Sequence, residues 1–500
     1  MPDDVAKAQV DAEPGIGTQN RTLIFIAALA SVFVTAIEAT IVATAMPTIV
    51  SSLGGFELMS WVFTSYLLTQ VVTVPIYGRL SDLYGRRPLL LLGSALFIVG
   101  SILCGFAWSM LSLVLFRVLQ GLGAGALMPV GRTLIGDIYH GTDRARMQGY
   151  VSSVFIGAAV LGPMVGAFLA THTIWPMVFW VNVPIAVFAA AVLFWGFDER
   201  IAKKRHRIDW GGCALICLGA GSLMFALAQT SSLGWAWASG LIGFSLVMIV
   251  VFILYERTVP EPIWPSWLWQ DRVAGSGNLV SLAVGATTMG IAAYLPLYIQ
   301  GVIGDTALVS GVTIMAMSAS GPVGALMAGR CMLRTSFRTT AFAGAIIYIV
   351  GSVMMTLLDP QSSAGWAMAS GLLMGFGIGM NNNTYLVAVQ SESAWNQRGV
   401  ATSSLVFSRI LGQAIGAAAF GGILTARLTS YLSGDDDLVS RIMANSLRTS
   451  LPADQIGPVI AQFDRALHVV FVILVGLAIV VAIVGFMLPK GRGLRPSEEA

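Results

Sequence analysis

Glu38 is the residue of this sequence best suited to chemistry within a lipid bilayer. It lies in the middle of an apolar run from Leu23 to Met46, and it is the only one of the chain's 25 Asp and Glu residues that lies so deep in such a run. A carboxylate near the centre of a membrane costs about 3 kcal/mol or more, so it is rarely accidental. An acid at this depth can bind a proton or attract a cation, which makes Glu38 the first candidate for a coupling site.

Arg117 is the natural partner of this acid. At about 1.5 Å per helical residue, Glu38 should lie ~15 Å and Arg117 ~11 Å from the same membrane surface. A nearby guanidinium favours the charged carboxylate, whereas burial favours the protonated form. Separating the two would change the proton affinity of Glu38, so we expect Glu38 to exchange a proton and Arg117 to modulate it. The alternative is a static ion pair or hydrogen-bond network that holds helices together.

The composition indicates that membrane-spanning helices position these two residues. Hydrophobic residues make up 56% of the chain and charged residues 11%, and the mean hydropathy is +0.79. A soluble chain would need about twice that charge to cover its surface, and backbone groups in lipid must be satisfied within helices. Windows of about 20 apolar residues predict fourteen helices, over residues 22–48, 58–78, 88–108, 110–132, 147–170, 175–197, 210–228, 235–255, 273–299, 309–329, 339–358, 365–389, 400–426 and 466–488.

The basic residues predict how these helices are oriented. Twenty-two of the 28 Lys and Arg residues fall on alternate, presumed cytoplasmic, segments, and six of the seven opposite loops carry none. This alternation predicts that both termini are cytoplasmic and that the number of helices is even. The exception is the opposite loop over 427–465, which we expect to be either a small hairpin or helix pair or a solvated spacer.

The same pattern predicts how the chain is divided. We expect a disordered cytoplasmic tail over 1–20, a six-helix bundle over 21–198 and a basic linker with two additional helices over 199–272. A second six-helix bundle follows over 273–488 and contains the extracytoplasmic loop 427–465, and a cytoplasmic tail covers 489–500.

The loop between the second and third helices carries the most specific motif. It reads Gly-Arg-Leu-Ser-Asp-Leu-Tyr-Gly-Arg-Arg over residues 78–87, in which the glycines permit a tight turn. It resembles the loop signature of the major facilitator superfamily, Gly-x-x-x-Asp-x-x-Gly-Arg-Arg/Lys. The resemblance implies a cytoplasmic latch made by Gly78, Asp82, Gly85 and Arg86, with Arg398 as a candidate partner. A purely static role for the loop is the alternative.

The first predicted helix resembles a narrower group, the fourteen-span drug:proton antiporters, and the fourth resembles the superfamily as a whole. The segment 38–47 is similar to their first-helix signature, although that group commonly has Asp where this chain has Glu38. The segment 115–125 resembles the superfamily's fourth-helix motif, in which a buried Arg, here Arg117, is followed by Gln-Gly. The resemblance implies that an acid is expected at position 38.

The fifth predicted helix resembles the antiporter motif of the superfamily. There Pro163 kinks the helix, and Gly162 and Gly166 allow close packing. The family usually has a second Gly where this chain has Ala167. Because the motif is associated with exporters, it bears on the direction of transport. Arg409 begins a further segment that is similar to the thirteenth-helix pattern of the same group.

Together these resemblances imply the fold. We expect an all-α integral membrane protein with the major facilitator fold, two six-helix bundles of inverted repeats plus two extra central helices, and a central cavity near the midplane. Polar residues at membrane depth are candidates to line this cavity or to form hydrogen bonds between helices. They are Gln70, Gln120, Tyr294, Tyr298, Asn381, Asn382, Asn383 and Arg409. For Arg409, a structural or gating role and binding of an anionic group on a substrate are both open.

The predicted function is proton-coupled secondary active export by alternating access. The expected cargo is amphipathic small molecules, with cations among the candidates, and the expected location is the cell inner or plasma membrane. We expect a monomer that uses the proton gradient and no cofactor or metal. No basic stretch suggests nucleic acid, no Lys stands in Gly-x-x-x-x-Gly-Lys-Ser/Thr, and the scattered histidines do not suggest an enzyme.

Two alternatives differ in substrate or in class. The same fold can export one endogenous metabolite, siderophore or lipid, which a narrow substrate profile would reveal. A non-transporting receptor or scaffold is the second alternative, which the absence of any proton-linked flux would favour.

Overall fold

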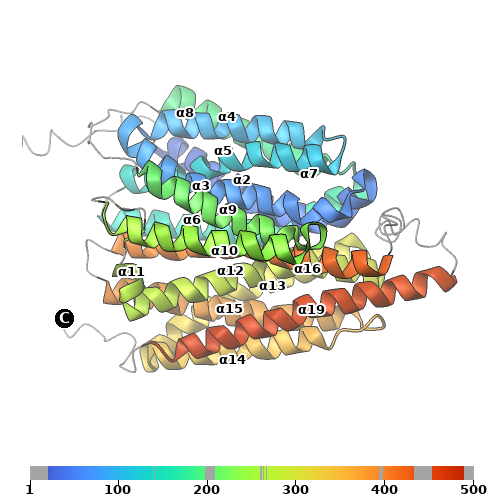
Figure 1. The fold of residues 1–500 in the computed structure, drawn as a ribbon. Helices are drawn as coiled ribbons and strands as arrows, with labels where there is room; N and C mark the ends of the chain where they lie inside the picture. Colours follow the sequence, from blue (N-terminus) through green and yellow to red (C-terminus); the bar gives the residue numbers. More distant parts are fainter. Residues whose placement is uncertain are drawn as a thin grey trace, which may run out of the picture.

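The structure, a computed structural model, describes residues 21–139, 141–197, 209–259, 262, 264, 265, 267–393, 398–432 and 453–488. These residues form long helices that lie alongside one another in one bundle (Figure 1). The N-terminal half consists of α2 (Arg21–Leu53), η2 (Phe56–Leu58), α3 (Met59–Tyr84), α4 (Arg86–Gly105), α5 (Met110–Ile138), α6 (Gly141–His172), α7 (Met177–Trp180) and α8 (Asn182–Gly196).

The remaining helices form a middle pair and a C-terminal half. The middle pair is α9 (Trp210–Ala228) and α10 (Thr230–Glu256), followed by the short α11 (Trp267–Gln270). The C-terminal half consists of α12 (Arg272–Tyr298), η3 (Ile299–Ile303), α13 (Ala307–Arg334), α14 (Phe337–Thr356), α15 (Ala364–Glu392), α16 (Arg398–Leu432) and α19 (Ala453–Gly485).

Among the described residues, 13 helical segments are long and apolar enough to cross a membrane. The helix predicted over 365–389 corresponds to α15, which has 29 residues and is long enough to span but is not among the 13. Its run of three asparagines and its many glycines explain the lower hydropathy. The described structure therefore contains a helix at the place of each of the fourteen predicted spans.

Several helices extend beyond their predicted ends. For example, α3 continues to Tyr84 and α13 to Arg334, and α19 begins at Ala453 rather than at 466. Hydropathy detects only the part of a helix that lies in lipid, whereas backbone hydrogen bonding continues into polar turns outside it. Much of the predicted 427–465 loop is thus helical, and its centre, residues 433–452, lies outside the described residues.

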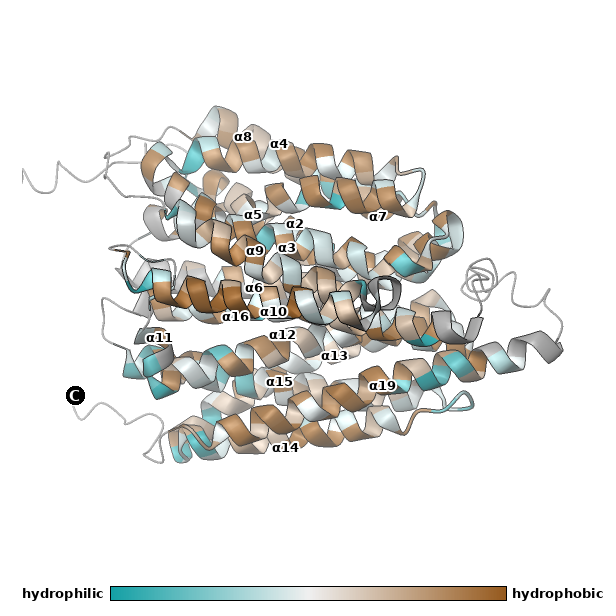
Figure 2. Ribbon diagram, viewed as in Figure 1, coloured by the Kyte–Doolittle hydropathy of each residue, from teal (hydrophilic) through white to brown (hydrophobic). Residues whose placement is uncertain are grey.

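The outer surface of the bundle is apolar, as a bilayer requires. Figure 2 shows hydrophobic residues along the outward-facing helices and hydrophilic residues mainly toward the helix ends. Large side chains such as Trp195 (81%), Leu326 (68%) and Ile483 (61%) keep these fractions of their surface exposed. In water such patches would drive aggregation, whereas in lipid they cost nothing.

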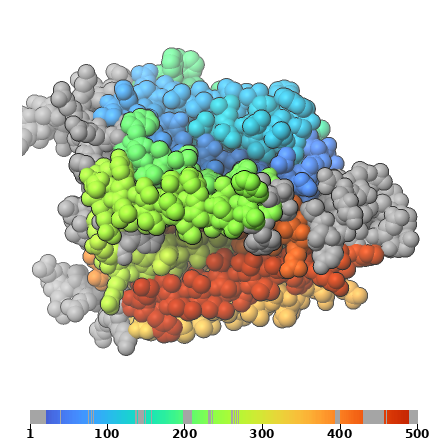
Figure 3. Space-filling view, viewed as in Figure 1, coloured from blue at the N-terminus to red at the C-terminus, as the bar shows by residue number. Residues whose placement is uncertain are grey.

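The two additional helices lie across the boundary between the halves. Figure 3 shows α10 between the N-terminal part of the chain and the C-terminal part. On the same side, α9 packs against both α3 and α16. The contact with α16 is so close that a Cβ added to Gly422 would come 1.8 Å from the Leu227 carbonyl oxygen. The middle pair therefore covers one side of the boundary in this conformation.

The halves also touch directly at one end of the bundle. A Cβ at Gly421 of α16 would lie 2.0 Å from the Ser60 Cβ of α3, so these backbones approach as closely as glycine allows. Nearby, the Phe56 and Phe463 rings pack edge to face at 5.9 Å. The basic-residue pattern predicts that this end is extracytoplasmic. With that orientation, the two halves of the bundle meet on the outer side.

Candidate functional site

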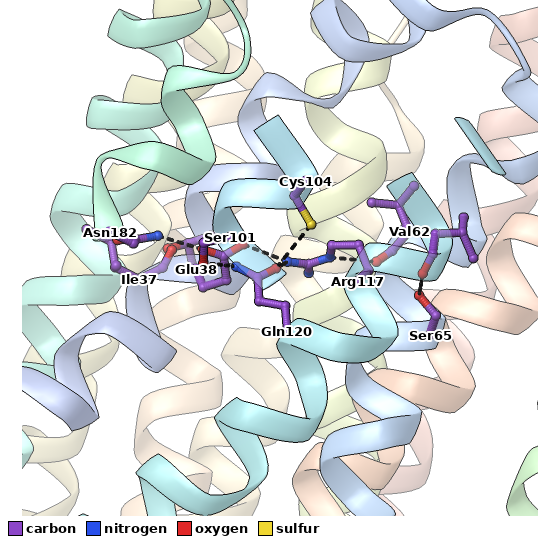
Figure 4. Close-up of polar contacts among 11 residues, drawn as sticks. Ile37, Glu38, Val62, Ser65, Ser101, Cys104, Arg117, Gln120 and Asn182 are labelled. Atoms are coloured by element: carbon purple, nitrogen blue, oxygen red, sulfur yellow. Dashed lines mark hydrogen bonds and ion pairs between the residues drawn. The ribbon is translucent and has the colours of Figure 1, made fainter. Parts of the chain in front are cut away.

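The Glu38–Arg117 ion pair is present. The Arg117 Nη1 atom lies 2.6 Å from the Glu38 Oε1 atom, and the two side chains are 1% and 0% exposed. Glu38 lies on α2 and Arg117 on α5 (Figure 4). This pairing agrees with the similar membrane depth that the sequence predicts for the two residues. A buried charge must be paired and hydrogen-bonded to be tolerated, and this pair meets that condition.

Arg117 is held from several sides besides the acid. Its Nη1 also donates to Gln120 Oε1 at 2.6 Å, and its Nε donates to the Val62 carbonyl oxygen of α3 at 3.0 Å. The ring of Tyr66 lies below the guanidinium at 4.1 Å, a cation–π distance. Gln120 in turn donates to Ser101 Oγ of α4 at 2.8 Å. The guanidinium is thus held by α2, α3 and its own helix, and Gln120 connects it to α4.

Asn182 completes the site, and the sequence reasoning did not identify it. Its Nδ2 donates to Glu38 Oε2 at 2.6 Å, so each carboxylate oxygen has a strong donor. Asn182 begins α8 directly after the break between α7 and α8 at Val181. The sequence feature that could have identified Asn182 is its position as a single amide near the start of a strongly apolar span. It gives a weak signal because the residue carries no charge.

The network lies entirely inside the N-terminal half. Glu38, Gln120 and Asn182 expose 1% or less of their surfaces, and their hydrogen-bond partners among the described residues come from α2, α3, α4, α5 and α8. In this conformation the carboxylate therefore has no open face toward a ligand. The arrangement keeps the ionised carboxylate buried beside its guanidinium, and only a rearrangement of the helices would expose it. In this conformation Glu38 cannot contact a substrate directly.

The antiporter-like motif links this site to the other half. A Cβ at Gly162 would lie 2.0 Å from Thr40 Oγ1, so α6 packs tightly on the turn of α2 that follows Glu38. On the other side, a Cβ at Gly311 of α13 would lie 2.7 Å from the Pro163 carbonyl oxygen. α6 is therefore packed between the helix of Glu38 and the C-terminal half.

The same motif explains the departure at Ala167. A Cβ at Gly311 would also lie 2.7 Å from the Ala167 Cβ, and Ala167 is fully buried. Gly166 packs against α2, where a Cβ would lie 2.3 Å from Thr44 Oγ1. The methyl group of Ala167 is accommodated because α13 has a glycine opposite it.

The latch motif forms a helix end and a one-residue turn. α3 continues through Gly78 to Tyr84, and Gly85 alone, at φ 97° and ψ 162°, separates it from α4. Arg86 Nη1 donates to Ser81 Oγ at 2.6 Å. The side chains of Asp82 and Arg398 lie outside the described part of the structure, so the predicted latch contact between them stays a prediction.

The predicted cavity residues occupy different environments. Gln120 belongs to the Glu38 network, Gln70 is 5% exposed, and Tyr294 is fully buried, with its hydroxyl donating to the Ala417 carbonyl oxygen at 3.2 Å. Tyr298 is also buried and donates to Asp464. In this conformation these side chains serve helix packing, and their predicted role in substrate binding stays a prediction.

The three asparagines of α15 point in different directions, as consecutive helical residues must. Asn381 is buried and donates to the Gly377 carbonyl oxygen at 2.9 Å, and its Oδ1 has no partner among the described residues. Asn382 is exposed. Asn383 donates across to the Ala325 carbonyl oxygen of α13 at 2.8 Å. Asn383 is thus an interhelical tie, and Asn382 is the one with a free face.

A second polar cluster in the C-terminal half was not expected. Tyr298 donates to Asp464 Oδ1 at 2.7 Å, and His468 Nδ1 lies 3.2 Å from the same oxygen and 2.8 Å from the Asp464 carbonyl oxygen. His468 Nε2 lies 2.8 Å from the Leu358 carbonyl oxygen. The hydropathy reading had placed Asp464 in the 427–465 loop, whereas it lies inside α19 and within a candidate span, Ile460–Gly485.

Comparison with known proteins supplies independent information. The family model described as Major Facilitator Superfamily matches residues 28–417. "Multidrug resistance protein 3" of Bacillus subtilis is 32% identical over 409 residues, which cover 81% of this chain and 80% of that protein. "Multidrug transporter protein MdtP" of the same species is 32% identical over 417 residues, covering 83% and 77%.

Solved structures agree on the fold. A bacterial homologue of the human lysosomal transporter Spinster, in an inward-facing and unoccupied conformation, superposes with a TM-score of 0.67 at 15% identity. The match covers 94% of this chain and 97% of that one. At this identity the likeness shows the fold alone, and with the helices described above it confirms the predicted fold class.

Proposed function

Because this chain belongs to the major facilitator superfamily, it is a multi-pass membrane transporter and not an enzyme, and we propose that it exports amphipathic small molecules in exchange for protons. The proposal on substrates is supported by the multidrug names of two relatives. The proposal on coupling has its main support in one observation, the fully buried Glu38–Arg117 pair in the N-terminal half.

The physical argument is that the pair has two stable arrangements. With Glu38 ionised, Arg117 and Asn182 satisfy both carboxylate oxygens, and the half is tightly held. With Glu38 protonated, the ion pair is lost and Arg117 must find another partner or reach water. A group whose charge state favours different packings can bias alternating access, which needs only a few kcal/mol of differential interaction.

The link from this pair to transport runs through α2 and α6. Thr40 and Thr44 of α2 lie against Gly162 and Gly166, and Pro163 of α6 faces the C-terminal half. A shift of α2 on protonation would therefore be passed by direct contact to the boundary between the halves. Non-additive effects of mutations at Thr40, Gly162 and Gly311 on transport would be evidence that this contact path carries the coupling.

Further details belong to the same proposal. We propose both termini in the cytoplasm, a location in the cell inner or plasma membrane, and function as a monomer driven by the proton gradient without cofactor or nucleotide. Cationic cargo was expected from the sequence. In the conformation described, however, Glu38 is enclosed and paired with Arg117.

The decisive experiment compares Glu38→Gln with the parent protein in inside-out vesicles. Export would be read as substrate-dependent release of quenching of a pH-sensitive dye. We expect Glu38→Gln to abolish proton-linked export while leaving the protein folded, because the amide keeps the shape and loses the titration. Glu57→Gln is the matched control, since Glu57 is an exposed acid outside the network. Full proton-driven export by Glu38→Gln would contradict the coupling role.

The same assay separates the alternatives. A broad panel of amphipathic dyes and drugs tests multidrug export against transport of one metabolite, siderophore or lipid. The absence of any proton-linked flux with every compound would favour the receptor or scaffold alternative.

A further inference from the structure

His468 has an acceptor beside each of its two ring nitrogens. Nδ1 lies 2.8 Å from the Asp464 carbonyl oxygen and 3.2 Å from Asp464 Oδ1, and Nε2 lies 2.8 Å from the Leu358 carbonyl oxygen. A neutral imidazole has one N–H donor and one lone pair, whereas an imidazolium has two N–H donors. Because carbonyl oxygens only accept, a protonated ring is needed to make both contacts as hydrogen bonds.

Packing fixes the orientation of this ring. Its centroid lies 5.9 Å from that of the Tyr298 ring and 5.8 Å from that of the Phe471 ring. Both aromatic side chains are fully buried, so the imidazole cannot turn one nitrogen away without moving its neighbours. In this conformation a neutral ring would leave a lone pair facing a carbonyl oxygen, and an unmade hydrogen bond of this kind costs free energy.

The charge in direct contact with the ring is the Asp464 carboxylate. Tyr298 of α12 donates its hydroxyl to the same carboxylate at 2.7 Å, and the turn between α14 and α15 brings the exposed Asp359 next to Leu358. The elements packed against α19 are α12, α14, α16 and η3. The other charged or titratable residues on these elements, and the exposed neighbour on α19 itself, are Arg272, Tyr294, Arg338, Tyr348, Arg398, Arg409, Arg427 and Arg465. Asp464 is thus the counter-ion at hand for an imidazolium.

The cluster is within reach of water. Asp464 and His468 expose 21% and 26% of their side chains. They lie ~6 Å and ~12 Å along the helix from Ile460, the start of the candidate span. In these respects the cluster differs from the Glu38 site, which is fully enclosed and belongs to the other half.

The cluster also adjoins the contact between the halves. Phe463, directly before Asp464, is fully buried and packs edge to face on Phe56 of η2 at 5.9 Å. The hydrogen bonds of Asp464 and His468 hold this turn of α19 on α12 and on the turn before α15. They therefore hold in place the ring through which α19 meets the N-terminal half.

We propose that His468 and Asp464 form a second proton-binding site, and that a proton on His468 stabilises the closed arrangement at this end of the bundle. Without that proton, one of the two carbonyl contacts is lost, and this turn of α19 is held less firmly against its neighbours. With the predicted orientation the site faces the outer side, so acid outside the cell favours the closed outer end. The proposal requires no particular cargo and no role for Glu38.

Protonation is measured by solid-state NMR of the full-length protein in lipid bilayers, with 15N-labelled histidine and without substrate or gradient. The His468 signal is the one absent from His468→Gln. In the parent protein it is also the one coupled to 13C-labelled leucine carbonyls, which identifies it should that variant not fold. Since imidazole usually titrates between about pH 5 and 8, we expect two N–H nitrogens at about pH 5 and one at about pH 9. A ring that is neutral at both pH values, or protonated at both, would overturn the proton site.

Closure is measured by double electron–electron resonance in lipid nanodiscs at the same two pH values. The spin labels are placed at Leu111 and Gln361, which are exposed and belong to different halves. His172→Gln is the matched control, because His172 is an exposed histidine at the end of α6 with an acceptor at Nδ1 alone among the described residues.

We expect the parent protein to shift toward longer distances at the higher pH, with the ratio of closed to open populations falling about tenfold or more, since hydrogen bonds to charged groups are among the stronger polar contacts. His468→Gln should show the longer distances at both pH values, and His172→Gln should respond as the parent does. A parent protein without a pH response, or a His468→Gln variant that keeps the full response, would overturn the proposal. Any titration of Glu38 is common to all three proteins and cancels in the comparison, so a failure of coupling at Glu38 leaves this test intact.

Discussion

Gly311 offers a direct test of how the halves meet in this conformation. An added Cβ would lie 2.7 Å from both the Pro163 carbonyl oxygen and the Ala167 Cβ, whereas ordinary contacts lie at 3.4–4 Å. Gly311→Ala must therefore push α13 from α6 or distort one of them. Overpacking of this kind costs about 1–3 kcal/mol. The cost applies only where the halves are closed at this end, so the population of that state should fall about 5- to 150-fold relative to the alternative.

The gain in helix propensity from Gly to Ala, about 1 kcal/mol, is present in both conformations and cancels. Gly329→Ala on the same helix measures the propensity effect alone, because a Cβ at Gly329 meets nothing within 4 Å. Spin labels at Ile174 and Leu357, which are 60% and 61% exposed and belong to different halves, report the separation by double electron–electron resonance. The accessible native cysteines would be replaced by serine.

We expect Gly311→Ala to move the distance distribution toward longer values and Gly329→Ala to leave it unchanged. An unchanged distribution in Gly311→Ala would show that the contact with Pro163 does not limit closure. A shift of the same size in both variants would point to helix propensity rather than to packing.

Two further variants test the site and its scaffold. Asn182→Leu removes the donor to Glu38 Oε2, and leaving that buried oxygen unpaired should lower the free energy of unfolding by about 1–3 kcal/mol, measured as thermal unfolding by scanning fluorimetry. Combining Asn182→Leu with Glu38→Gln should cost less than the sum of the two single changes. Strict additivity would mean that the two side chains do not interact. Gly85→Ala places a side chain at φ 97°, which should cost on the order of 1–3 kcal/mol and lower the unfolding temperature. Gly78→Ala lies inside α3 with open space around its Cβ, so it should keep or raise the unfolding temperature through helix propensity. Equal unfolding temperatures for the two variants would contradict strain at Gly85.

The sequence predicts the position of a side chain well where that residue carries a charge inside the membrane, and poorly where it does not. The pairing of Glu38 with Arg117 could be predicted because two charges in lipid must find each other, and their depth follows from the rise of a helix. The role of Gln120 could not, because it lies three residues from Arg117 on the same helix. Nothing in its spacing tells whether it faces a cavity or the ion pair, and the structure places it on the pair.

The other features that the sequence does not predict involve helix ends, neutral polar residues and packing between distant segments. Asp464 was assigned to a loop because hydropathy ends where lipid ends, whereas α19 begins eleven residues before it. Asn182 was missed because an amide costs far less in a membrane than a charge and gives a weaker signal. The close packing of Ala167 on Gly311 joins residues far apart in the chain, and no local pattern encodes that proximity.

The energetics of the Glu38 network are large enough for the role proposed for it. Removing one partner of a buried ion pair typically costs 3–5 kcal/mol, about 4 kcal/mol as a central value, because the other charge is left uncompensated. If Glu38 takes up a proton, Arg117 is that remaining charge, and its other acceptors among the described residues are Gln120 and the Val62 carbonyl oxygen. Coupling in transporters and allosteric proteins usually needs about 1–3 kcal/mol. A conformation that gives Arg117 water or a new acceptor would therefore be favoured on protonation by more than the amount required. Tight enclosure of the pair increases this difference, so the inaccessibility of Glu38 in the present conformation supports a coupling role rather than opposing it.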